Sequence, residues 1–240
     1  ENYPIVLTTF YFMKQQEFKM DSRMAYQGTQ TSVLEQNKVL RNTYSLLAMT
    51  LAFAALVAGG AMALNLPHPG FIITVVGFYG LLFWVSRAAN SSMGLVAVFA
   101  LTGFMGYTLG PILNMVIGAG GGEIVMMALG GTALTFFGVS AYALTTKRDL
   151  SFLNGMMIAG FWVLVVAMVA NFFLSIPALG LAISAMFILF SSGAILLQTQ
   201  AIVKGGEKNY IMATVTLFVS IYNIFLSLIQ LLMAFGGNDD

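Results

Sequence analysis

Cysteine is absent from this 240-residue chain, and histidine occurs once, as His68. Without thiols the chain can form no disulfide framework, no thiolate nucleophile and no cysteine-ligated metal site. A single histidine also excludes a metal centre that is built from several imidazoles. We therefore expect no metal and no cofactor, and cysteine-dependent enzymes are removed from the functions open to this sequence.

Charged residues are scarce as well. They make up 8% of the chain, whereas hydrophobic residues make up 59%. Soluble domains carry about 25% charged residues, because their surface has to be hydrated. A bilayer core about 30 Å thick is crossed by roughly 20 apolar residues in a helix. We therefore expect the outer surface of this protein to face lipid.

Apolar runs follow one another along most of the chain. They are continuous and lack the alternation of barrel strands, so they predict helices. The expected spans are about residues 43–64, 70–86, 93–117, 124–145, 152–174, 178–202 and 210–235. The predicted fold class is an all-α membrane protein with a bundle of seven transmembrane helices. A polar tail, residues 1–42, precedes the bundle, and a short external C-terminus, residues 236–240, follows it.

The first twelve residues differ from the polar stretch that follows them. They contain an apolar run, Ile5–Phe12, which is too short to span a bilayer. This run lacks the basic flank and the cleavage site of a signal peptide. One interpretation is a non-native upstream extension, with Met13 or Met20 as the true start. The alternative is a buried or partner-bound strand.

The basic residues predict the topology. Five Lys and Arg residues lie in the tail, and the loops after the second, fourth and sixth spans contain one, two and two. The other loops and the C-terminus contain none. Because cytoplasmic loops are enriched in Lys and Arg, the N-terminus is predicted to be cytoplasmic and the C-terminus periplasmic.

Ionisable residues are missing from the middle of every expected span. Proton-coupled transport needs a buried ionisable relay, and an intramembrane aspartyl protease needs two buried carboxylates. A serine protease would need a buried histidine beside its serine. The chain is therefore not expected to be an enzyme. Uncharged polar residues do occur in the spans, either as interhelical hydrogen-bonding groups or as the lining of a polar cavity.

Glycines recur at helical spacing in the third span. Gly106 and Gly110 form a GxxxG pair, which allows close helix packing within the bundle or, less commonly, a dimer face. Pro111 follows directly and removes a backbone hydrogen bond, so the helix is expected to bend there. Gly110 and Pro111 are a candidate hinge, and a fixed bend is the alternative interpretation.

Three segments together resemble a known family. They enter the first span, lie in the third span and lie in the last span: Val39–Tyr44, Phe104–Ile112 and Leu217–Phe225. These segments are similar to motifs of the Bax inhibitor-1 family, and the resemblance covers roughly residues 38–235. It implies a bundle in which six helices surround a central seventh.

Further segments resemble a bacterial inner-membrane branch of that family. They are Ala128–Leu134, Ser191–Leu196 and Gly205–Tyr210. The resemblance implies a non-enzymatic protein that binds and modulates an FtsH-type membrane AAA+ protease, together with its HflK/HflC partner complex. Besides these partners only membrane lipids are expected, with no nucleic acid and no small-molecule substrate.

Members of that branch are slow substrates that occupy the protease. A protease of this kind has to grip a flexible cytoplasmic tail, and the polar stretch of residues 13–38 lies on the predicted cytoplasmic side. The candidate engagement residues are Met13, Lys14, Lys19, Arg23 and Lys38. An ordinary disordered terminus is the alternative reading of this stretch, since such tails are common.

Other members of the family imply a second function, a pH-sensitive calcium or cation leak. There, two aspartates on the last two helices are thought to close a pore through a shared proton. The matching positions in this chain are Gln198 and Ser220, and neither side chain ionises. These two residues are candidate cavity-lining positions, but the pH switch is lost and a pore without acidic groups attracts Ca²⁺ weakly.

Overall fold

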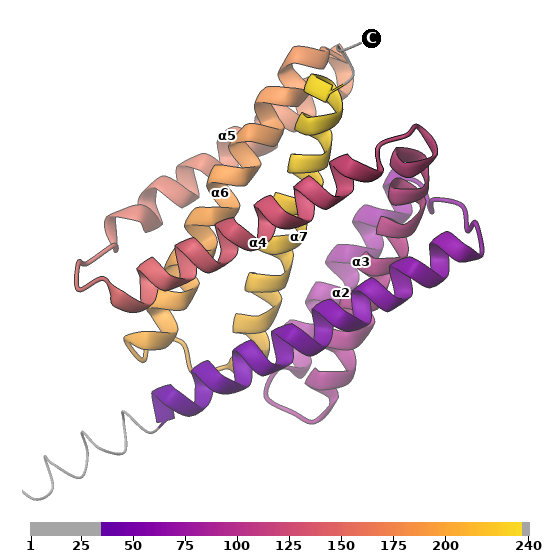
Figure 1. Ribbon diagram of the computed structural model, residues 1–240. Helices are drawn as coiled ribbons and strands as arrows, with labels where there is room; N and C mark the ends of the chain where they lie inside the picture. Colours follow the sequence, from indigo (N-terminus) through magenta and orange to yellow (C-terminus); the bar gives the residue numbers. More distant parts are fainter. Residues whose placement is uncertain (1–34, 237–240) are drawn as a thin grey trace, which may run out of the picture.

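The computed structural model describes residues 35–236, and every regular element in this range is an α-helix (Figure 1). Seven of these helices are long and apolar enough to cross a membrane. They are the first helix (Glu35–Ala63), α2 (Phe71–Ala88), α3 (Met93–Gly118), α4 (Gly122–Thr145), α5 (Phe152–Leu174), α6 (Pro177–Val203) and α7 (Tyr210–Gly236). The predicted all-α, seven-helix membrane fold is confirmed.

The first helix differs from the expected span at its beginning. Residues 35–42 were assigned from the sequence to the polar tail, but they are helical and continue into the apolar span without a break. A helix of 29 residues is about 44 Å long, which exceeds a hydrocarbon core of about 30 Å. The extra polar turns therefore extend beyond the apolar run, and the helix is longer than its membrane-crossing part.

Helix α7 lies in the interior of the bundle. It packs against α3, α4 and α6, whereas α5 packs against α6 and α2 packs against α3 (Figure 1). In α7 and α3 a window of 18 residues is 44% buried, compared with 6% in α5. These contacts place α7 against three other helices, and the expected arrangement of six helices around it stays a prediction. Helix α5 contributes one buried side chain, Leu164.

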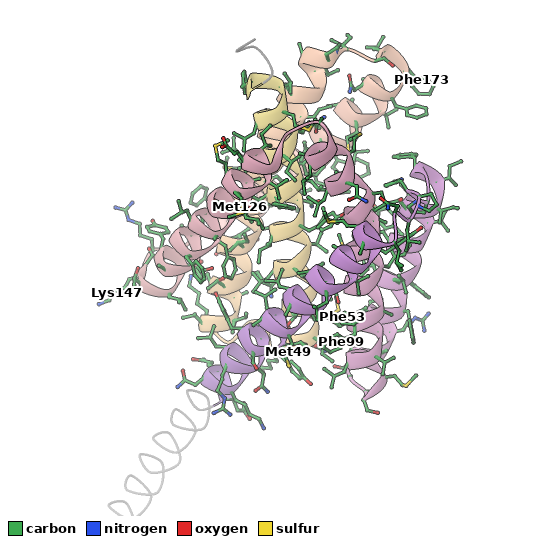
Figure 2. All side chains as sticks on the ribbon, turned by 45° about the vertical axis from the view of Figure 1, so that its right-hand side comes forward. Met49, Phe53, Phe99, Met126, Lys147 and Phe173 are labelled. Carbon is green, nitrogen blue, oxygen red and sulfur yellow. The ribbon has the colours of Figure 1, made fainter. Side chains whose placement is uncertain are left out.

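Large apolar side chains cover the outside of the bundle. They include Met126 on α4 and Phe173 at the end of α5, whose side chains are 70% and 78% exposed (Figure 2). In water such a surface would drive aggregation, but in a bilayer it faces hydrocarbon. The main core instead contains buried side chains that range from alanine to Phe136 and Phe218, from the inner faces of the first helix, α2, α3, α4, α6 and α7.

The first helix packs closely against α3 through small residues. An added Cβ atom at Gly110 would lie 2.8 Å from the Ala58 backbone oxygen and 2.6 Å from Ala61 Cβ. At Gly106 it would collide with the backbone of Ala54. The GxxxG pair is therefore used inside the bundle, where glycine lets two backbones approach without a side chain between them. On the lipid side of this contact, Phe53 meets Phe99 edge to face, with ring centroids 5.4 Å apart (Figure 2).

Candidate functional site

One end of the molecule collects all the basic residues of the described chain. We define the basic end as the start of the first helix, Glu35–Arg41, with the end of α2 and the α2–α3, α4–α5 and α6–α7 loops. Its seven basic side chains are all exposed: Lys38, Arg41, Arg87, Lys147, Arg148, Lys204 and Lys208. Lys147 points away from the bundle in Figure 2. Only Glu35, Asp149 and Glu207 oppose this charge locally, so the end is positive.

Polar contacts hold the loops of the basic end together. The Asn209 side-chain amide donates to the Ala89 backbone oxygen at 3.1 Å and to Asn90 Oδ1 at 2.8 Å. The Gln200 amide donates to the Arg148 backbone oxygen at 3.0 Å. The Asn209 contacts join the α6–α7 loop to the α2–α3 loop, and the Gln200 contact joins α6 to the α4–α5 loop, so a connected frame carries the positive surface.

Asp149 and Lys204 form an ion pair within this frame, with 3.1 Å between Oδ1 and Nζ. The same carboxylate accepts from the Ser151 hydroxyl at 2.5 Å and from the Ser151 backbone N–H at 3.1 Å. These Ser151 hydrogen bonds and the adjacent Lys204 ammonium lower the pKa of Asp149 to about 2. Asp149 is thus ionised at neutral pH, where it fixes the loop that carries Lys147 and Arg148.

The predicted engagement residues are divided by the boundary of the described chain. Met13, Lys14, Lys19 and Arg23 lie outside the described residues, and their role stays a prediction. Lys38 is exposed on the first helix. Near it, the side chain of Gln36 lies against Gly205 of the α6–α7 loop, where an added Cβ would come within 2.7 Å of Gln36 Nε2. The beginning of the first helix therefore contacts the α6–α7 loop.

Gln198 and Ser220, the cavity-lining candidates, are not joined by a hydrogen bond in the described chain. The Ser220 hydroxyl donates to the Thr216 backbone oxygen at 2.8 Å. The Ser184 hydroxyl donates to Gln230 Oε1 at 2.6 Å, which sets the register of the antiparallel α6 and α7. By that register Gln198 is level with Thr216, and Ser220 lies four residues, about 6 Å, farther along the axis.

Buried polar groups surround the level of Gln198 and form a layer near the basic end. The Thr214 hydroxyl donates to the Thr43 backbone oxygen at 3.2 Å, and Tyr44 Oη lies 3.3 Å from Thr199 Oγ1. This polar layer draws on the first helix, α6 and α7. Threonines, which are easily overlooked as spacers in apolar runs, supply most of its hydroxyls.

Some polar atoms of the bundle are buried without a hydrogen-bond partner among the described residues. They are Thr43 Oγ1, Ser140 Oγ, Ser191 Oγ and Gln198 Nε2. Such groups are uncommon in folded proteins, and each costs free energy unless water or a ligand satisfies it. Thr43 belongs to the polar layer, and Gln198 adjoins Thr199, which also belongs to it. Gln198 could be singled out from the sequence as a candidate position, whereas Ser140 and Thr43 could not.

The candidate hinge, Gly110 and Pro111, lies inside α3. The helix is continuous from Met93 to Gly118, with Pro111 in its interior. Gly110 is buried against the first helix, so its small size has a packing role. Motion at these residues stays a prediction.

The described residues supply a charged docking surface and few reactive groups. Within residues 35–236 there is no group of three or more His, Asp or Glu side chains that could hold a metal ion. The arrangement offers a positive face, a long helix that begins on this face, and a buried polar layer just inside it. These features suit binding of another macromolecule or passage of a small polar species.

Comparison with known proteins identifies a family whose sequences match this chain. A family model described as "Inhibitor of apoptosis-promoting Bax1" matches residues 36–237. The "Modulator of FtsH protease YccA" of Escherichia coli strain K12 is 57% identical over 220 residues, which are 92% of this chain and 100% of the relative. The "Inner membrane protein YccA" of Escherichia coli O6:H1 shows the same identity and coverage. The "Uncharacterized protein PA2604" of Pseudomonas aeruginosa is 53% identical over 228 residues, 95% of this chain and all of the relative.

Proposed function

Since the chain belongs to the Bax inhibitor-1 family and is a multi-pass inner-membrane protein, we propose that it is a non-enzymatic modulator of an FtsH-type membrane AAA+ protease. One observation carries this proposal: a relative that is 57% identical over its full length bears the name of a modulator of that protease.

The basic end supplies the geometry for this role. Because inner-membrane proteins keep their basic loops in the cytoplasm, we assign the basic end to the cytoplasmic side. The tail, residues 1–34, is joined to the first helix at this end. A protease that grips the tail would then stand next to the positive surface formed by the three loops. HflK/HflC would join the same assembly through the protease.

The tail is the proposed point of engagement, with Met13, Lys14, Lys19 and Arg23 as contact residues, together with the exposed Lys38 at the start of the first helix. An AAA+ protease pulls on such a segment and has to unfold the bundle before it can continue. A chain that engages readily but unfolds slowly occupies the protease and spares other substrates. Competition of this kind needs no active site on the modulator.

Pulse–chase lifetimes in cells test this function. Deleting residues 13–34 should lengthen the lifetime of the protein to the value seen when the protease is depleted. Replacing Lys14, Lys19 and Arg23 together by Gln keeps the length of the tail and isolates the effect of its charge. A wild-type lifetime that does not respond to protease depletion would refute the proposal.

A cation leak is the second candidate, and the unpartnered polar atoms favour it. Gln198 Nε2 and Thr43 Oγ1 lie unsatisfied in or beside the polar layer, where water could enter. If the protein leaks, liposomes that contain it should pass monovalent cations or Ca²⁺. Gln198→Asp with Ser220→Asp should then add pH dependence to the flux, because paired carboxylates share a proton. Electrically silent liposomes under all conditions would exclude the leak.

A further inference from the structure

The first helix is the element that receives the force when the tail is pulled. The tail joins this helix at Glu35, on the basic end. Force applied to the tail therefore acts along the helix axis, toward the basic end. The first helix is the first part of the bundle that has to leave, and its contacts set the resistance to extraction.

The contact with α3 interlocks along this direction. Ala54, Ala58 and Ala61 share one face of the first helix and are 7%, 3% and 3% exposed. They lie against Gly106 and Gly110, at distances that leave no room for a further carbon atom. We call these five residues the glycine seam. If the first helix slides, its alanine methyl groups have to pass over the backbone of α3, which forces the two helices apart.

Two hydrogen bonds fasten α3 to the far end of the first helix and to the loop that follows that helix. The Asn114 side-chain amide donates to the Met62 backbone oxygen at 3.0 Å. The Tyr107 hydroxyl donates to the Pro67 backbone oxygen at 2.8 Å. Met62 and Pro67 lie at the end opposite the tail, so a pull toward the basic end loads both bonds directly. Tyr107 itself stands between the two glycines of the seam.

We propose that the glycine seam and the Tyr107 and Asn114 hydrogen bonds form the barrier that makes this chain a slow substrate. This inference rests on the proposed function, because it concerns how fast an engaged protease proceeds. The seam resists sliding, while the far-end bonds resist displacement of the helix end. Release of either one speeds extraction without changing the tail.

Matched substitutions test the barrier. Gly106→Ala places a methyl group against the Ala54 backbone, whereas Gly80→Ala and Gly130→Ala meet nothing within 4 Å. We expect Gly106→Ala to shorten the protease-dependent lifetime roughly tenfold, because overpacking a tight contact destabilises it. The two control variants should keep the wild-type lifetime, since alanine favours a helix.

A second pair avoids steric strain. Tyr107→Phe removes the bond to Pro67, and Tyr79→Phe removes a hydroxyl that has no hydrogen-bond partner in the described chain and lies on a side chain 59% exposed. Loss of one interhelical hydrogen bond should shorten the lifetime about threefold for Tyr107→Phe. Tyr79→Phe should have no effect. This pair keeps the proposal testable if Gly106→Ala fails to fold.

Lifetimes are measured with the protease present and after its depletion, for wild type and all five variants. Lifetimes of Gly106→Ala and Tyr107→Phe that are shorter than wild type with the protease present, and that equal the wild-type lifetime once the protease is depleted in both, support the barrier. If wild type is degraded by the protease but Tyr107→Phe behaves like Tyr79→Phe, the barrier lies elsewhere and the inference is wrong, while the proposed function stands. If depletion leaves the wild-type lifetime unchanged, both fail.

Discussion

Replacement of Gln198 by Met should stabilise the bundle. The Nε2 atom of Gln198 is buried in the helix-packed interior and has no hydrogen-bond partner among the described residues. Methionine has nearly the same length and shape, but it carries no N–H group that needs a partner. The substitution removes an unsatisfied donor while it keeps the packing volume.

The expected size of this stabilisation follows from two free energies. An unsatisfied buried donor costs about 1–3 kcal/mol in a folded protein. Within a membrane, polar groups also find hydrogen-bond partners in the unfolded reference state. Interhelical hydrogen bonds therefore stabilise the fold by only about 0.6 kcal/mol on average. We therefore expect Gln198→Met to raise the free energy of unfolding by about 1 kcal/mol.

Gln230→Met is the matched control, because it makes the same chemical change where the amide is used. Gln230 Oε1 accepts from Ser184 at 2.6 Å. Losing this bond should lower the free energy of unfolding by about 0.6 kcal/mol. Both variants are measured by equilibrium unfolding in mixed detergent micelles, followed by tryptophan fluorescence. If Gln198→Met is instead destabilised by about 1 kcal/mol, the amide holds an ordered water or another partner, and our reasoning about it is refuted.

Three further predictions concern the loops and the core. Asp149 has its pKa lowered from 3.8 to about 2 in the folded protein. Its contribution to stability is present above about pH 4 and is lost as the pH falls toward 2, so Asp149→Asn should flatten this part of the melting temperature profile. Tyr222→Phe removes the 3.0 Å contact between Tyr222 Oη and Thr108 Oγ1, and should lower the free energy of unfolding by about 0.6 kcal/mol. The chain has no cysteine, so His68→Cys should react with an impermeant thiol reagent in spheroplasts, while Lys208→Cys should react only after permeabilisation.

Each of these predictions has a contrary result. A melting profile of Asp149→Asn that parallels the wild type between pH 4 and 2 would mean that the carboxylate charge does not stabilise the loop. A loss well above 2 kcal/mol for Tyr222→Phe would assign its hydroxyl to a larger network than the contact with Thr108. Labelling of Lys208→Cys from outside would invert the proposed orientation and place the tail away from a cytoplasmic protease.

The helices were predictable because continuous apolar runs in a chain with 8% charged residues have one stable arrangement in a bilayer. The partner of each helix was not predictable in the same way. The spacing of Gly106 and Gly110 defines a face of α3, but it does not identify the first helix as the neighbour. That neighbour depends on alanines about 50 residues earlier, whose small size signals nothing by itself.

The limits of the site prediction have a similar cause. The ion pair of Lys204 and Asp149 joins residues 55 positions apart, and no local pattern connects them. The length of the first helix was also missed. Residues 35–42 are mostly polar and were assigned to the tail, although polar residues also form a helix where the helix extends beyond the membrane and packs against a loop. Gln198 was singled out through the family's aspartate pair, but its lack of a partner was visible only in three dimensions.

The proposed complex with the protease is tested most directly by a pull-down at near-native expression. The tagged protein is purified in mild detergent, and the co-purified proteins are identified and quantified by mass spectrometry. A variant that lacks residues 13–34 is purified in parallel. We predict stoichiometric recovery of the FtsH-type protease with HflK and HflC from the full-length chain, and strongly reduced recovery from the shortened variant. Recovery of none of these proteins with the intact full-length chain would contradict the modulator function.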